Sequence, residues 1–186
     1  MGAGRPVAGK MPEPVTDIGG ILIPSTDPVF LAVVGVHVVL GITCVAAGAV
    51  AMLSPKRTGR HPNYGKIYFW SLSALVATAT GLAVVRWAED YHLFILGALA
   101  FAFAYFGRVT RRQLWRGWAR LHMTGMGGSY ILMLTAFLVD NGKFLPFWRD
   151  LPPLALWFVP SIIGLPILAY ALLRHPLVRR MGVTAP

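Results

Sequence analysis

The chain has 186 residues, of which 56% are hydrophobic and only 13% charged, and its mean hydropathy is +0.62. Because a soluble domain carries about 25% charged residues, this composition excludes an ordinary soluble protein. The net charge of +10 does not indicate nucleic-acid binding, since the cations sit between apolar blocks and no recognition module is visible.

The residues before the first apolar block, 1–28, are rich in Gly and Pro and lack the continuous apolar core of a signal peptide. We expect them to form a mobile N-terminal tail. Residues 175–186 are expected to form a basic C-terminal tail.

Between these tails the apolar residues fall in five blocks, each of about the length that spans a bilayer. The blocks cover residues 29–53, 67–86, 91–107, 122–140 and 154–174. The sequence therefore predicts an all-α integral membrane bundle of five transmembrane helices over residues 29–174. We expect this bundle to contact the lipid bilayer, and it could also bind other membrane protein subunits.

The first predicted span contains His37, about 12 Å below the nearer boundary at 1.5 Å per residue. Ionisable side chains are costly inside lipid, so each one invites a functional hypothesis. A neutral imidazole offers one donor and one acceptor, and His37 could therefore ligate a haem, bind a quinone or relay a proton. The alternative is a histidine that is hydrogen-bonded to a neighbouring helix.

The positive charges gather in the first and third connections and in the C-terminal tail. By the positive-inside rule these parts are cytoplasmic and the N-terminus is outside, as five spans require. We therefore predict a multi-pass protein of a bacterial inner membrane. The cations are Lys56, Arg57, Arg60, Lys66, Arg108, Arg111, Arg112, Arg116, Arg120, Arg174, Arg179 and Arg180.

Two histidines, His61 and His122, each end a basic connection and open a span, and their spacing of 61 residues is a hint of an internal repeat. If the two helix starts are adjacent, the imidazoles could bind one metal ion. They could instead bind an anionic headgroup with the help of Arg60 and Arg120. The alternative is a pair of interfacial polar residues that cap helices.

A stripe on the fourth predicted span begins at His122 and continues through Gly125, Met126, Ser129 and Met133. This spacing places all five on one helix face. A cofactor could lie there with Met126 as a soft contact, or the stripe could serve close helix packing, which small residues and a flexible Met both favour.

Three segments resemble an uncharacterised family of small predicted bacterial multi-pass membrane proteins, a domain of unknown function. They are a first-span histidine (His37), the run Arg60–Tyr68 (RHPNYGKIY) and the run Leu121–Met133 (LHMTGMGGSYILM). The family has a histidine in the first helix, an HRWLGRxY-like segment and an HRRWM-like segment. The resemblance brings no established activity, but it implies that the three histidines act as a set. Residues 62–64 and 123–125 depart from the family pattern, so no role is carried over for them.

These features lead to a first functional hypothesis, a redox-type protein in which His61 and His122, with His37 as a separate site, hold a haem, a metal ion or a quinone. The competing hypothesis is a non-enzymatic accessory or assembly subunit of a larger membrane complex, and the third is a small transporter. No nucleophile triad, phosphate loop or paired carboxylates indicate an enzyme class.

Overall fold

The fold is that of a computed structural model, which describes residues 16–18, 21–23, 27–56, 59–175 and 178. Five helices in these ranges are long and apolar enough to cross a membrane, so the predicted all-α, five-span architecture is confirmed. The helices are α1 (Pro28–Leu53), α2 (Arg60–Val85), α3 (Trp87–Arg112), α4 (Trp118–Asn141) and α5 (Pro153–Arg174). A short 3-10 turn, η1 (Gly142–Phe144), follows α4.

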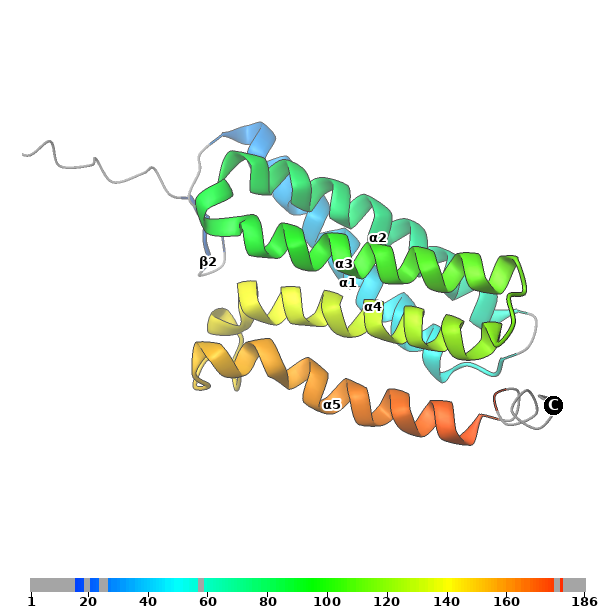
Figure 1. The fold of residues 1–186 in the computed structure, drawn as a ribbon. Coiled ribbons are helices and arrows are strands. Elements are labelled where there is room, and N and C mark those ends of the chain that lie inside the picture. Colours follow the sequence, from blue (N-terminus) through cyan, green and yellow to red (C-terminus); the bar gives the residue numbers. More distant parts are fainter. Residues whose placement is uncertain (1–15, 19–20, 24–26, 57–58, 176–177, 179–186) are drawn as a thin grey trace, which may run out of the picture.

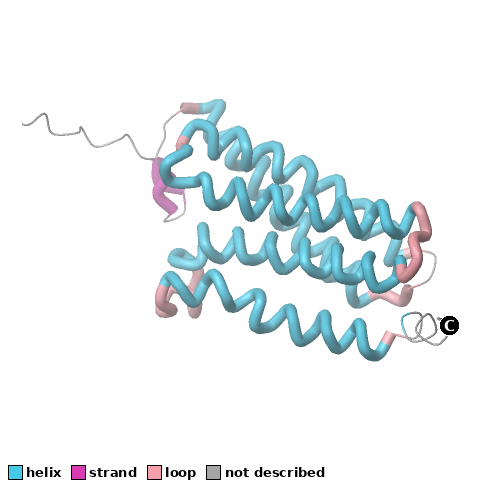
Figure 2. The backbone as a smooth tube through the Cα atoms, in the orientation of Figure 1, coloured by secondary structure: helices cyan, strands magenta, loops and turns pink. Residues whose placement is uncertain are grey.

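The helices form two hairpins and an added fifth helix (Figure 1). Within the hairpins, α1 packs against α2 and α3 against α4; α2 then packs against α3, and α5 lies against α4. Short loops reverse the chain at both ends (Figure 2). We call the end where α1 and α3 stop and α2 and α4 start the basic end, which lies at the right in Figure 1. As a result, α2 and α4 run parallel to each other.

The three central helices extend beyond the apolar blocks of the sequence. α2 begins at Arg60 and not at 67, α3 spans Trp87–Arg112, and α4 begins at Trp118. A helix can continue into the headgroup layer because its backbone stays hydrogen-bonded while polar side chains reach water. Pro62 is tolerated because it lies in the first turn of α2, where the backbone N–H has no helical partner. His61 is therefore part of the helix.

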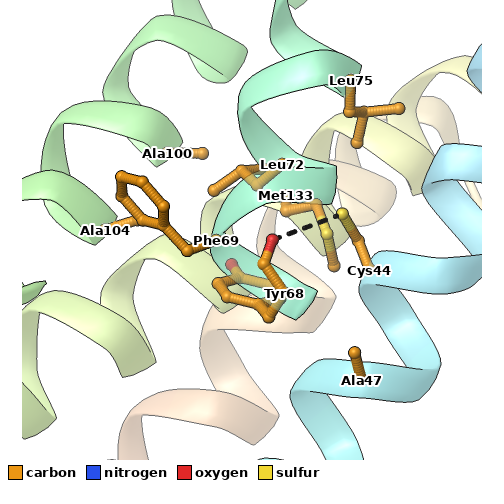
Figure 3. Close-up of a cluster of buried hydrophobic side chains, with 9 residues drawn as sticks. All are labelled: Cys44, Ala47, Tyr68, Phe69, Leu72, Leu75, Ala100, Ala104 and Met133. Atoms are coloured by element: carbon orange, nitrogen blue, oxygen red, sulfur yellow. Dashed lines mark hydrogen bonds between the residues drawn. The ribbon is translucent and has the colours of Figure 1, made fainter. Parts of the chain in front are cut away.

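The core lies where the first four helices meet (Figure 3). It combines small side chains, which let the backbones approach, with larger ones that fill the centre. By contrast, α1 and α5 turn most of their apolar side chains outward, as expected for contact with lipid. The core residues are Cys44, Ala47, Tyr68, Phe69, Leu72, Leu75, Ala100, Ala104 and Met133.

The predicted tails lie largely outside the described residues. In the N-terminal one, two three-residue strands are described, β1 (Thr16–Ile18) and β2 (Ile21–Ile23), which pair antiparallel. Asp27 then caps α1, since its carboxylate accepts from the backbone N–H of Val29 at 2.7 Å. In the C-terminal tail, Arg179 and Arg180 lie outside the described residues.

Candidate functional site

The structure brings His61 and His122 together at the basic end. Their ring centres are 6.3 Å apart and the ring planes are nearly perpendicular, at 86°. His61 is the second residue of α2 and His122 the fifth of α4. The parallel helices therefore place the two imidazoles at one level, close to the start of each helix, and both side chains are half-buried.

Each histidine is anchored through the same ring nitrogen. The Nδ1–H of His61 donates to the backbone carbonyl of Ala51 at 2.8 Å, and the Nδ1–H of His122 donates to the carbonyl of Gly107 at 2.8 Å. A carbonyl oxygen can only accept, so Nδ1 carries the proton in both rings. A neutral imidazole then has its lone pair on Nε2. A backbone carbonyl that orients a histidine in this way is the usual second partner of a metal-ligating imidazole.

The anchor of His122 depends on an unusually close contact between α3 and α4. A Cβ atom built on Gly125 would lie 2.7 Å from the Cα of Gly107, and one built on Gly107 would lie 3.0 Å from the backbone nitrogen of Met126. Because both positions are glycine, the backbones touch and the Gly107 carbonyl reaches His122. The close packing predicted for the Gly125 stripe is thus present. Met126 takes part in it, with its Cγ beside Gly107.

Two turns deeper, a second polar pair closes the site toward the membrane interior. The hydroxyl groups of Tyr68 and Ser129 are hydrogen-bonded at 2.8 Å, and both residues are fully buried. The Tyr130 hydroxyl donates to the carbonyl of Val45 at 3.0 Å, and the Cys44 thiol is directed at the carbonyl of Tyr68 (Figure 3). Tyr68 was not among the site residues predicted from the sequence, although it follows His61 by seven residues, as Ser129 follows His122.

The electrostatic surroundings of the pair are cationic. The Lys56 ammonium donates to the carbonyls of Ala51 and Met52, so His61 and Lys56 share one acceptor. Burial lowers the pKa of Lys56, whereas its carbonyl acceptors favour the charged form. Lys56 was not singled out from the sequence. The two predicted anion contacts, Arg60 and Arg120, are exposed at the same end of the bundle.

His37 does not join this site. It lies 14 residues before Ala51 on α1, a rise of about 21 Å. Its Nδ1 lies 2.9 Å from the hydroxyl of Thr78, and that hydroxyl donates to the carbonyl of Leu75. Because the hydroxyl proton of Thr78 is used in this way, the Nδ1–H of His37 must donate to the Thr78 oxygen. This is a hydrogen bond to a neighbouring helix, the alternative to a cofactor role for His37. His92 also lies elsewhere, with its ring packed 5.7 Å from that of Trp157.

Within the described ranges, no group of three or more His, Cys, Asp or Glu side chains is placed to hold a metal ion. Any centre held here would thus rest on the two imidazoles and on ligands from outside the protein. Comparisons of the chain with family models, with curated proteins and with solved structures gave no match.

Proposed function

We propose that this multi-pass membrane protein is a redox protein in which His61 and His122 ligate one metal centre at the basic end of the bundle. The observation that carries the proposal is the geometry of the pair: two imidazoles 6.3 Å apart, each anchored at Nδ1 with Nε2 left as the electron donor. The membrane-spanning bundle would hold these two ligands at a fixed separation.

The separation favours ligands on opposite sides of one metal. With metal–nitrogen bonds of about 2.0–2.1 Å, the centre of each ring lies about 3.2 Å from the metal, so opposed imidazoles have centres about 6.3 Å apart. Tetrahedral placement would bring the centres to about 5 Å. The observed 6.3 Å agrees with the opposed arrangement, which suits six-coordinate iron or two-coordinate copper better than structural zinc.

The hydrogen bonds of the two histidines also favour a metal over a quinone as the ligand of this site. A quinone carbonyl is an acceptor and needs a donor from the protein. Both Nδ1–H groups already donate to backbone carbonyls, so neutral rings present only acceptor nitrogens to a ligand. A lone pair is what a metal ion requires, and we therefore place the metal ahead of the quinone.

In this function the protein contributes orientation and shielding. The carbonyls of Ala51 and Gly107 fix the tautomer and the direction of each ring, while the Tyr68–Ser129 pair closes the side toward the lipid interior. A metal held in this way would supply one-electron chemistry. The site would exchange electrons at the membrane surface, because both histidines lie within the first two turns of their helices.

The test is an absorption spectrum and a metal analysis of the full chain purified in detergent. We expect a bound metal, with or without a Soret band, that is lost in H61A and in H122A. The controls are H37A and H92A, which remove imidazoles outside the site and should retain the metal. A purified, folded protein with no metal, or metal content unchanged in H61A and H122A, would overturn the proposal.

A further inference from the structure

We infer that the metal enters this site inside an anionic tetrapyrrole, a haem, and not as a free ion. Lys56 and Arg111 bind the carboxylates of the macrocycle, and Gly65 leaves room for its ring. This inference rests on the proposed function and deepens it. Three features carry it: the charge around the histidines, the absence of acidic residues in the sequence of the basic end, and the open space beside Gly65.

The first feature is the position of the cations. Because Lys56 and His61 donate to the same Ala51 carbonyl, at 3.1 Å and 2.8 Å, the ammonium lies close to the His61 ring. Arg111, in the last turn of α3, has its guanidinium 4.6 Å from the centre of the Trp118 ring, and Trp118 begins the helix α4 that carries His122 four residues later. A cationic side chain therefore lies beside each of the two helix starts that carry the imidazoles.

The second feature is the lack of any compensating carboxylate. The sequence contains no Asp or Glu between residues 28 and 88 or between 91 and 139, so neither connection at the basic end carries an acid. A free divalent ion would be repelled by the Lys and Arg side chains without a protein carboxylate to offset them. In a haem, the macrocycle cancels two charges of the iron and two carboxylates add negative charge. Those carboxylates could form charge-assisted hydrogen bonds with Lys56 and Arg111.

The third feature is space. Gly65 lies between His61 and Tyr68 on the helix face that both share, and it is half-buried. A Cβ atom built on Gly65 would have no atom within 4 Å, in contrast to Gly107 and Gly125, which touch each other. From the level of His61 to that of Tyr68, α2 rises by about 10 Å. Over this distance, Gly65 presents bare backbone and open space beside it, as a flat ring would require.

The experiment compares ligands on the purified full chain after its bound metal or cofactor has been extracted. The probes are hemin, hemin dimethyl ester, Cu⁺ and Zn²⁺, followed by absorption and by direct metal binding. We expect hemin to give a Soret shift that needs both His61 and His122, and the ester, which lacks the negative charges, to bind at least about tenfold more weakly. K56Q and R111Q should weaken hemin by a similar factor and leave the ester unchanged.

A size variant tests the space independently. We expect G65L to prevent hemin binding while the protein stays folded, and G81L, whose glycine is also free of neighbours within 4 Å, to bind hemin like the parent. Melting curves of both variants establish that they fold.

The outcomes separate this inference from the proposed function. Equal affinity for hemin and its ester, unchanged hemin binding in G65L, or binding of Cu⁺ or Zn²⁺ but not hemin through the two histidines, would overturn the inference and leave a histidine metal site standing. If no probe binds, or if binding persists in the H61A/H122A double variant, the proposed function fails as well.

Discussion

Tyr68 and Ser129 share a hydrogen bond of 2.8 Å across the core, and they are 61 residues apart in the chain. The same interval separates His61 from His122, whose rings meet at the basic end. Both contacts have the same separation in the chain because α2 and α4 are parallel helices in equal register. Each is the second helix of a hairpin. The hint of a repeat in the sequence thus corresponds to paired contacts in space.

The Tyr68–Ser129 bond makes a direct prediction about stability. Y68F leaves the Ser129 hydroxyl buried without its partner, and S129A does the same to Tyr68, so each should lower the unfolding free energy by about 1–2 kcal/mol. The double variant should be little worse than either single one, because the shared bond is already lost. A double-mutant cycle of unfolding in detergent measures this coupling. Strictly additive effects would show that the two hydroxyls do not act as a pair.

The contact between Gly107 and Gly125 predicts strong sensitivity to one methyl group. In G125A the new Cβ would lie 2.7 Å from the Gly107 Cα, and overpacking of this kind costs about 1–3 kcal/mol. We expect a lower melting temperature for G125A and, since the contact sets the His122 anchor, weaker metal binding. The matched control is G81A, which meets no neighbour and should gain helix stability. A G125A protein as stable as the parent would contradict the close contact.

The hydrogen bond between His37 and Thr78 predicts an effect on stability without an effect on the metal. T78V removes the acceptor of the His37 N–H, and such bonds between membrane helices average about 0.6 kcal/mol. Metal content and spectrum should not change, because the basic end is about 21 Å away along α1. T80V is the control, since the Thr80 hydroxyl bonds only within its own helix. Loss of the metal in T78V would show that the two sites are coupled.

The orientation predicted from the charges can be tested by labelling. Gln113 is exposed at the basic end and Lys143 at the opposite end. The native Cys44 is fully buried, so it should not react with a maleimide. In intact cells, a membrane-impermeant maleimide should label K143C, and Q113C only after permeabilisation, because the basic end is expected in the cytoplasm. The reverse pattern would invert the topology and place the histidine pair outside.

The sequence alone determined the class of the protein and the number of its helices. Five apolar blocks separated by short polar connections leave no other way to satisfy the backbone in lipid. It also singled out His61 and His122, since each follows a basic connection and opens a span. The close approach of α4 through Gly125 was likewise predictable, because small residues at helical spacing favour it.

Only the tertiary structure decided which of these residues meet. The 6.3 Å between the imidazoles, the carbonyls of Ala51 and Gly107 as their anchors, and the pairing of Tyr68 with Ser129 all depend on helices that are distant in the chain. Periodicity reports which face of one helix is apolar, but not the rotation and depth of its neighbour. Those are decided by packing at a few glycines and by where each helix begins, and α2 begins at Arg60, seven residues before its apolar block.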